Sequence, residues 1–336
     1  MGTTQDSRGG SDGPILVAGA DRSGTSLMFA LLASHPAISM VRRTNLWRWY
    51  YDGYGDLRVA ANLQRCLDAL DRYPRVQRLS LDRERLCREL HQGPPTYGRL
   101  FSLIHEHHAE RVGKRRWGDK SLHTEHHLPT ILAEVPDARL IQMVRDPRDR
   151  YASVLKRYDG RSKGIGAAMG RWLRSTAAIT RNERRSPASV MTVRYETLAR
   201  DPEGTMRAVC TFVGEPYDAE MLTMRGAPDH GGTGGNSSFA RFEPGVISTR
   251  SIGRFRDVLA PADIASVQSV AGRRMQQFGY APVDVDWPST YARISFALTV
   301  QPIRTARLAG WLLKERVDYP DGRPRHGPPT PEPASG

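Results

Sequence analysis

The sequence predicts an α/β fold in which a parallel sheet carries helices on both faces and includes a helical insertion. Three short apolar runs, at residues 14–18, 139–144 and 189–193, have the length and composition of buried strands. Segments with apolar residues at helical spacing alternate with these runs, as expected when crossover helices join parallel strands. Ligands bind such sheets at the carboxyl ends of the strands, so the residues after each run are the first candidates for a site.

The predicted helices follow the strands in order along the chain. The first run leads through a glycine-rich turn into a helix at 26–34, which ends before His35-Pro36. From about residue 45 to 112, leucines recur at helical spacings without a clear strand, which predicts the insertion. Residues 229–236 are rich in glycine and predict a loop. Further helices are expected at 128–135, 147–158, 165–181, 202–213 and 262–278.

The composition of the two ends predicts one domain, residues 14–316, between disordered tails. Residues 1–13 are polar and glycine-rich, which also argues against a signal peptide, and residues 317–336 are rich in proline and glycine. No apolar run approaches the roughly 18 residues of a membrane span. Three cysteines without a C-x-x-C pair indicate a reducing cytoplasm rather than a disulfide framework.

The chain is strongly basic. Its formal net charge is +13, from 49 Lys and Arg against 36 Asp and Glu, and only five of those 49 are Lys. The arginines are scattered, whereas nucleic-acid binding favours a concentrated basic patch with aromatic residues between the charges. We therefore expect no nucleic-acid partner. An anionic small molecule or an acidic surface fits the charge equally well.

The turn after the first apolar run, within VAGADRSGTSL (17–27), nearly matches the phosphate-loop pattern G-x-x-x-x-G-K-[ST]. Gly19 and Gly24 have the right spacing and Ser26 supplies the hydroxyl, but Thr25 replaces the lysine. Backbone N–H groups of the turn and the helix N-terminus favour a bound anion. Because the lysine that would steady a transferring γ-phosphoryl group is absent, we expect a different anion. The alternative is a tight glycine turn with a helix cap. The residues predicted to contact the anion are Arg22, Ser23, Gly24, Thr25 and Ser26.

A second candidate anion site follows the run at 139–144. Arg145 stands at the end of that strand, and Asp146 is a suitable N-cap for the next helix. Ser153 and Arg157 are one helical turn apart, so both can converge with Arg145 on one anion. Alternatively, Arg145 pairs with Asp146 or Asp149, and Ser153 is a neutral helix residue. Two phosphate sites on neighbouring turns suit a nucleotide with phosphate at both its 5′ and 3′ ends.

These two stretches resemble motifs of the P-loop sulfotransferases that use 3′-phosphoadenosine 5′-phosphosulfate (PAPS). VAGADRSGTSL resembles their 5′-phosphosulfate loop, and VRDPRDRYASVLKR resembles their 3′-phosphate motif. WGDKSL resembles the segment whose lysine contacts the bridging or sulfuryl oxygens, here Lys120. VRYETLARDP resembles a segment with a tyrosine near the adenine, here Tyr195. STRSIGRFRDVL resembles the late loop that closes over the nucleotide, with Ser251, Gly253 and Arg254 as candidates.

The resemblance runs in family order over roughly residues 14–280 and is nearest to the tyrosylprotein and the bacterial carbohydrate or natural-product branches. It implies transfer of a sulfuryl group from PAPS to a hydroxyl or amine of a carbohydrate, glycolipid or natural-product acceptor. The resemblance also implies that no metal takes part, and that Arg22 and Lys120 stabilise the negative charge of the transferred group. The acceptor and the oligomeric state stay open.

The sequence departs from the family where a catalytic base is expected. Asp21 replaces a proline, and Arg42 and Arg43 stand where the tyrosylprotein branch has a glutamate. His123, three residues after Lys120, is the first candidate for the base. Its rivals are Asp21, Asp119 and Glu125. The two arginines also suggest a positive acceptor site, suited to a sugar phosphate or a carboxylated glycolipid.

Other interpretations stay open. The chain could be a P-loop kinase or NTPase with a degenerate loop, or a non-catalytic nucleotide-binding protein. The histidines of HEHH (105–108) and HTEHH (123–127) lack the HExxH pattern and a nearby cysteine, so no metal is expected. Residues 293–316 mix large apolar and basic side chains, and they could contact a membrane surface, cap the acceptor site or pack on the domain. Pro302 is expected to kink or divide that helix.

Overall fold

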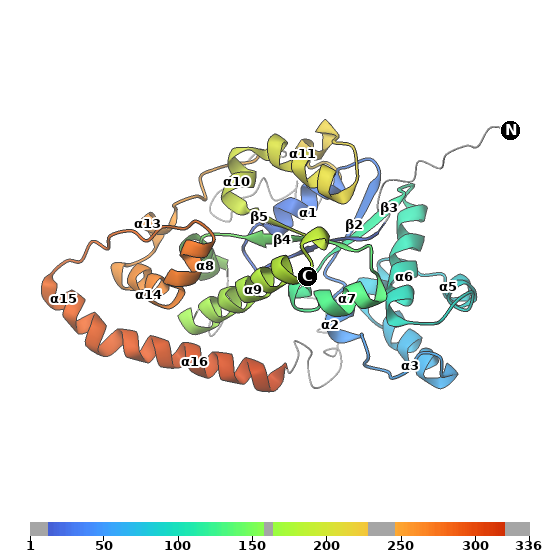
Figure 1. Cartoon of the computed structure of the whole chain (residues 1–336), viewed down its shortest axis with the longest axis horizontal. Coiled ribbons are helices and arrows are strands. Elements are labelled where there is room, and N and C mark those ends of the chain that lie inside the picture. Colours follow the sequence, from blue (N-terminus) through green and yellow to red (C-terminus); the bar gives the residue numbers. More distant parts are fainter. Residues whose placement is uncertain (1–12, 158–163, 228–245, 320–336) are drawn as a thin grey trace.

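The computed structural model describes residues 13–157, 164–227 and 246–319, and within these ranges the fold is built on one parallel sheet (Figure 1). Its five strands lie in the order β2-β3-β1-β4-β5, and every neighbouring pair is parallel. The strands are β1 (Ile15–Ala18), β2 (Ile38–Arg42), β3 (Arg116–Lys120), β4 (Arg139–Val144) and β5 (Val190–Arg194). The predicted α/β class is therefore confirmed.

Two of these strands, β2 and β3, are absent from the sequence prediction. β3 has the sequence RWGDK, whose charged residues do not resemble a buried strand, yet all five of its residues are buried. Its charges are satisfied inside the protein: the Arg116 guanidinium lies 3.0 Å from Glu215, and Asp119 accepts a hydrogen bond from Thr44 at 2.6 Å. Tertiary partners thus outweigh the local composition.

Helices cover both faces of the sheet, as predicted. Ile15 and Val17 of β1 pack in one core cluster with α1 (Thr25–Ala33), α10 (Tyr195–Arg200) and α11 (Pro202–Val213). Leu16 and Ala18 point to the opposite face and pack in a second cluster, which includes α7 (Leu128–Glu134). This alternation follows from the period of two along a strand.

The segment between β2 and β3 is helical, as the leucine spacing predicts. Leu63, Leu67 and Leu70 form the buried side of α3 (Ala60–Asp71). Its helices extend the second core cluster to one side of the sheet (Figure 1). They are α2 (Leu46–Trp49), α3 (Ala60–Asp71), α4 (Pro74–Gln77), α5 (Arg83–Leu90) and α6 (Tyr97–Arg111).

A third core cluster joins the helices that follow β4 to those at the end of the described chain. The predicted helices after β4 are present, and α9 runs further than predicted, to Arg185. The helices of this part are α8 (Pro147–Arg157), α9 (Ile165–Arg185), α13 (Phe255–Val258) and α14 (Pro261–Gln277). Short 3₁₀ turns lie at Thr124–His126, Pro187–Ser189 and Ala219–Thr223. The predicted loop at 229–236 and most of the predicted tails at 1–13 and 317–336 lie outside the described residues. The described helix α16 (Gln301–Asp318) includes the first two residues of the predicted C-terminal tail.

The helical segment predicted at 293–316 packs on the domain along α9 (Figure 1). It comprises α15 (Thr290–Ser295), a π-helical turn (Phe296–Val300) and α16 (Gln301–Asp318). The division falls just before Pro302, which lies in the first turn of α16, because proline has no N–H to continue the preceding helix. In the described ranges, no helix is both long and apolar enough to cross a membrane.

Gly170 on α9 allows α16 to approach closely, since a Cβ atom there would lie 2.0 Å from the Trp311 ring. We expect Gly170→Ala to lower the free energy of unfolding by about 1–3 kcal/mol, because the overpacking outweighs the gain in helix propensity. Gly272 of α14 is the matched control, because no atom lies within 4 Å of a Cβ there. Gly272→Ala should stabilise by about 0.5–1 kcal/mol. Chemical denaturation of both variants checks the contrast, and equal effects would contradict the packing described.

Candidate functional site

The turn between β1 and α1 has the backbone of an anion cradle. Gly19, Arg22 and Gly24 all have positive φ, at 135°, 65° and 93°. A Cβ at Gly19 would lie 2.3 Å from the Met143 carbonyl oxygen, so only glycine fits there. Gly24 is the N-cap of α1 and provides no side-chain cap for the first N–H groups of the helix. These N–H groups and the helix dipole are therefore available to an anion.

Ser23, in the middle of the cradle, supports the same conclusion. Its side chain is 1% exposed, and in the described part of the chain its Oγ atom has no hydrogen-bond partner. A buried hydroxyl without a partner is costly, so such a group commonly has a ligand or water partner. Thr25 is buried beside it, and Ser26 is partly exposed on α1. The cradle thus fits an anion better than the alternative of a self-capped turn.

Cationic side chains gather at the carboxyl ends of the neighbouring strands. Lys120 ends β3 and is in register with Val17 of β1 and with Arg42, the last residue of β2. Lys120 is only 3% exposed. Its burial, followed by the charges of Arg43 and Arg42, lowers its pKa to about 8, and Arg22 contributes in the same direction. We call Arg22, Arg42, Arg43 and Lys120 the cationic cluster.

The neighbouring carboxylate offsets only part of this charge. Asp119 opposes the lowering of the Lys120 pKa, but burial and the charges of Arg43 and Arg42 have larger effects. The Oδ2 atom of Asp119 accepts hydrogen bonds from Thr44 at 2.6 Å and Ser121 at 2.7 Å. A buried ammonium held among arginines is unfavourable in the free protein. An anion bound in the cradle would relieve that cost, so the geometry favours one.

The second predicted anion site lies against the first. Arg145 donates from Nη1 to the Arg22 carbonyl oxygen at 3.2 Å and from Nη2 to the Ser251 carbonyl oxygen at 2.8 Å. Arg22 in turn donates from Nε to Ser153 Oγ at 3.0 Å. The Arg145 guanidinium also stacks over the Tyr195 ring, 4.4 Å from its centroid. The structure therefore brings residues of both motifs and of the late loop together.

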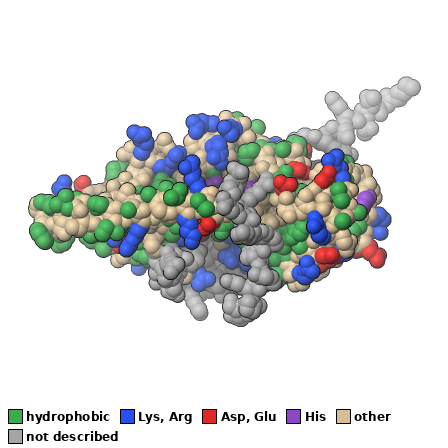
Figure 2. Space-filling model, turned by 90° about the horizontal axis from the view of Figure 1, so that it is seen from below, with side chains coloured by type: hydrophobic (Ala, Val, Ile, Leu, Met, Phe, Trp, Pro, Cys, Tyr) green, Lys and Arg blue, Asp and Glu red, His purple; other side chains and the backbone are tan. Residues whose placement is uncertain are grey.

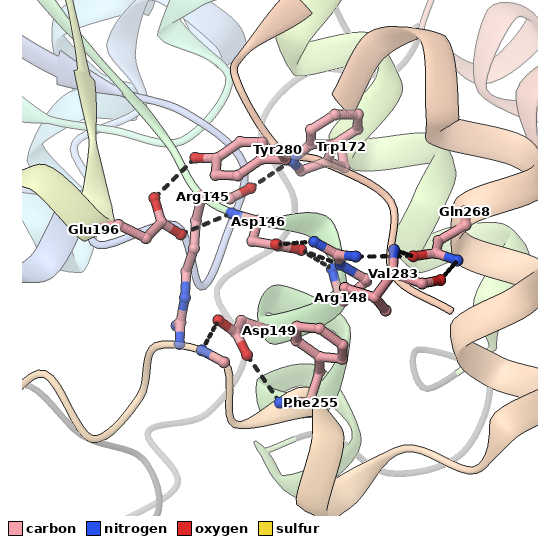
Figure 3. Close-up of polar contacts among 11 residues, drawn as sticks. Arg145, Asp146, Arg148, Asp149, Trp172, Glu196, Phe255, Gln268, Tyr280 and Val283 are labelled. Atoms are coloured by element: carbon pink, nitrogen blue, oxygen red, sulfur yellow. Dashed lines mark hydrogen bonds and ion pairs between the residues drawn. The ribbon is translucent and has the colours of Figure 1, made fainter. Parts of the chain in front are cut away.

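In the alternative interpretation Arg145 pairs with Asp146 or Asp149, but both carboxylates make other contacts. Asp146 accepts the backbone N–H of Arg148 at 2.8 Å, as predicted for a helix cap, and pairs with the guanidinium of the same residue at 2.7 Å. Asp149 accepts the backbone N–H groups of Gly253 at 2.7 Å and Phe255 at 2.9 Å. Figure 3 shows Arg145 running from the end of β4 toward this segment, with Asp149 beside it. The Arg145 Nε atom is buried and lacks a partner among the described residues.

Several supporting residues were missed in the sequence. Arg150, fully buried on α8, binds the backbone and carboxylate of Asp21 and so fixes the cradle. Trp172 donates to the Arg145 carbonyl oxygen at 2.9 Å, and Glu196 accepts the Asp146 N–H at 2.9 Å (Figure 3). In the sequence, the run RDPRDR (145–150) was the feature that pointed to such contacts. If its charged residues are buried, they need polar partners from other parts of the fold.

Some residues that were predicted to contact PAPS do not join the hydrogen-bond network around Arg145. Arg157 is exposed at the last residue of α8, and Arg254 is exposed and lies 3.4 Å from Asp257. Tyr195 is only 1% exposed, and a Cβ at Gly24 would lie 2.7 Å from its ring, so the tyrosine supports the cradle directly. Gly253 has a φ of 73° and is held by Asp149.

The candidate bases occupy different environments. Burial alone would raise the pKa of Asp21, but Arg150 and Arg171 outweigh it and hold the pKa below its usual value. An ion-paired carboxylate of this kind is a weak base. Asp119 is bonded to two hydroxyls, as described above. His123 has a φ of 72°, and burial followed by the charge of Arg48 holds its pKa well below the usual value, so its imidazole is neutral.

Glu125 is the candidate that touches the cradle. It is buried, accepts a hydrogen bond from Ser175 at 2.5 Å and lies beside the Gly19 N–H. Its Oε2 atom has no hydrogen-bond partner within the described ranges, and burial raises its pKa. Asp119 Oδ1 likewise has no hydrogen-bond partner within the described ranges, so Asp119, His123 and Glu125 remain candidates for the base, and of these Glu125 contacts the cradle.

Two histidines of the first run, HEHH (105–108), make structural contacts with other described residues. His105 bonds to the Phe101 carbonyl oxygen and stacks on Trp117, with ring centroids 4.6 Å apart, and His107 lies 2.8 Å from Glu89. Across the described residues, no group of three or more His, Cys, Asp or Glu side chains is arranged to hold a metal ion. The expectation of metal-free chemistry remains a prediction.

Comparison with solved structures shows the same fold in two sulfotransferase domains. The domain from the Synechococcus PCC 7002 olefin synthase aligns with a TM-score of 0.52 and 20% identity, covering 82% of this chain and 95% of that chain. The domain from the curacin biosynthetic pathway aligns with a TM-score of 0.51 and 19% identity, covering 81% and 99%. A search of curated proteins finds no significant match.

A family model described as the sulfotransferase family matches residues 14–219, which is more than half of the sequence. The matched range includes the cradle, the cationic cluster and Arg145. With this match and the shared fold, the chain belongs to the sulfotransferase family.

Proposed function

We propose that this sulfotransferase uses PAPS as its donor and transfers the sulfuryl group to a hydroxyl or amine of a carbohydrate, glycolipid or natural-product acceptor. The observation that carries the proposal is the direct contact between the two anion sites. Arg22 reaches Ser153, and Arg145 reaches the Arg22 carbonyl, so one ligand with two anionic ends would bridge them. Adenosine with phosphate at its 5′ and 3′ positions has this form.

The chain's residues fit such a donor. The cradle would hold the 5′ end through backbone N–H groups and the buried Ser23 hydroxyl. Arg145, Ser153 and the segment at Ser251 would hold the 3′-phosphate. Bound PAPS would supply the sulfuryl group, whose charge spreads over its equatorial oxygens. Lys120 and Arg22 would stabilise that charge, because preorganised cations in a buried site act strongly.

The kinase alternative fits the geometry less well. Thr25 replaces the lysine that would steady a transferring γ-phosphoryl group, and it is buried. Asp146, the one clear acid directly after a strand predicted from the sequence, is engaged as a helix cap and with Arg148, so it is unsuited to hold a magnesium ion.

The cationic cluster also supports an anionic acceptor. Arg42 and Arg43 lie close enough to Lys120 to lower its pKa, so they add positive potential beyond the donor cradle. A sugar phosphate or a carboxylated glycolipid would be attracted to this potential. The expected cytoplasmic location stays a prediction from the cysteine count.

The first test is sulfuryl transfer itself. We expect wild-type protein to transfer label from PAPS, labelled in its sulfuryl group, to a member of a panel of carbohydrates and natural products. Lys120→Met should lower kcat/KM by about 10²–10³-fold, because a positioned cation is lost. Transfer from γ-labelled ATP instead would support the kinase. Binding of the product nucleotide without any transfer would support the non-catalytic alternative.

The pH dependence of the same assay isolates Lys120. Since its pKa is lowered to about 8, the ammonium is present below that pH and is lost as the pH rises through it. The wild-type kcat/KM should therefore fall above pH 8. Lys120→Arg is the matched control, because arginine stays charged to beyond about pH 12. The same fall in both proteins would contradict the assignment.

Removal of the two additional arginines tests the acceptor class. Arg42→Ala and Arg43→Ala should each raise the KM of an anionic acceptor about tenfold or more, because the attracting charge is lost. The affinity for adenosine 3′,5′-bisphosphate should change less. Arg58→Ala, at a 75% exposed side chain that pairs with Asp56 and is not part of the cluster, serves as the control. An unchanged acceptor KM in both cluster variants would rule out the anionic acceptor.

A further inference from the structure

The exposed large apolar side chains of the described chain are concentrated on α15, the π-helical turn and α16. Leu298 is 73% exposed and Leu313 is 64% exposed. A single exposed leucine is common on protein surfaces, but several large apolar side chains on one helical segment are informative. Figure 2 shows hydrophobic side chains along this helical segment, which forms the left arm of the view. The exposed members are Tyr291, Ile294, Leu298, Ile303, Leu313 and Val317.

The inner face of α16 is already occupied. Leu308 is buried in the third core cluster, and Trp311 packs over Gly170 of α9. Polar contacts fix the same face, since Arg304 pairs with Asp263 at 2.8 Å and Arg174 pairs with Glu315 at 2.7 Å. The helix is therefore held on the domain without help from its outer face.

The outer face of α16 is continuously apolar. At 3.6 residues per turn, positions spaced by three and four residues fall on one side of a helix. On the side of α16 opposite the buried Leu308, five exposed residues follow this spacing. We call them the outer stripe: Ile303, Ala306, Gly310, Leu313 and Val317. An apolar surface of this kind usually marks an interaction site.

Basic residues border the outer stripe on both sides. Arg307 and Lys314 lie about 100–120° from Leu308 on one flank, and Arg316 lies about 80° away on the other, by helical geometry. All three are exposed. The acidic residues of α16 do not balance them, because Glu315 is paired inward with Arg174 and Asp318 is only partly exposed. The face thus combines an apolar centre with cationic margins.

We propose that the outer stripe of α16 docks on an anionic lipid bilayer, with the helix lying in the plane of the interface. Apolar side chains in the centre would enter the headgroup–acyl boundary, and the flanking cations would contact lipid phosphates. Anionic lipids attract basic residues near the surface, which matches the charge of the margins. This inference concerns binding alone and does not depend on the proposed donor or acceptor.

Two other occupants fit less well. A second copy of the chain pairing through the same stripe would bring the basic margins of both copies together, which opposes association. Residues 320–336, beyond α16, contain no Leu, Ile, Val, Phe, Trp or Tyr, so their sequence offers no large aliphatic or aromatic side chain to cover the stripe. A bilayer complements both the apolar and the cationic parts.

The test is flotation of the full-length protein with vesicles. We expect binding to phosphatidylcholine vesicles that contain phosphatidylglycerol, and at least about tenfold weaker binding to vesicles of phosphatidylcholine alone. Ile303→Glu and Leu313→Glu should each weaken binding to the anionic vesicles about tenfold or more, because a charge enters the apolar stripe. The controls are Val59→Glu and Val112→Glu, at side chains 51% and 48% exposed elsewhere on the surface, which should bind as wild type.

Thermal unfolding and light scattering accompany the assay. All four variants change exposed residues, so their melting temperatures should match that of the wild type. Absence of wild-type binding to anionic vesicles overturns the proposal, and so does equal loss in the stripe and control variants. A wild-type dimer that Leu313→Glu converts to a monomer, without vesicle binding, also overturns it and assigns the stripe to self-association.

Discussion

The site depends on a buried cation placed by strand register. Because β3 lies between β1 and β2, Lys120 is aligned with the end of the strand that leads into the cradle and with Arg42 on its other side. Burial and the neighbouring arginines make its charge unfavourable in the free protein. The stability of the fold elsewhere holds this arrangement in place, and a bound anion would recover the cost. Electrostatic strain of this kind is typical of sites that stabilise developing negative charge.

The second constraint is the coupling of two strand ends by one guanidinium. Arg145 spans from β4 to the cradle and to the late loop by donating to two backbone carbonyls. Asp149 fixes the same loop through two N–H groups (Figure 3). Arg150 fixes the cradle through Asp21. Arg145 at the end of β4, together with Asp149 and Arg150 of α8, thus positions two separate segments, the cradle and the late loop. A change in any of them would shift both anion sites together, since the residues act through shared contacts.

The sequence was informative where apolar runs and local motifs coincide. The strands at 14–18, 139–144 and 189–193 and their helices were predicted because apolar composition and turn residues agree. β3 was missed because Arg116, Asp119 and Lys120 are buried through tertiary partners that lie far away in the sequence. The proximity of Lys120 to Arg42 and Arg43 was missed for the same reason. The base could not be chosen from spacing, because the contact of Glu125 with the cradle depends on how the turn after β3 folds back.

The most direct measurement is a calorimetric titration of the wild-type protein with adenosine 3′,5′-bisphosphate and with 5′-AMP, repeated with Arg145→Gln. A 3′-phosphate held by charge-assisted hydrogen bonds should strengthen binding about tenfold or more. The account predicts that wild type prefers the bisphosphate by this margin and that Arg145→Gln binds both nucleotides equally. Equal binding of both nucleotides by the wild type would contradict the two-site account, as would an undiminished preference in the variant.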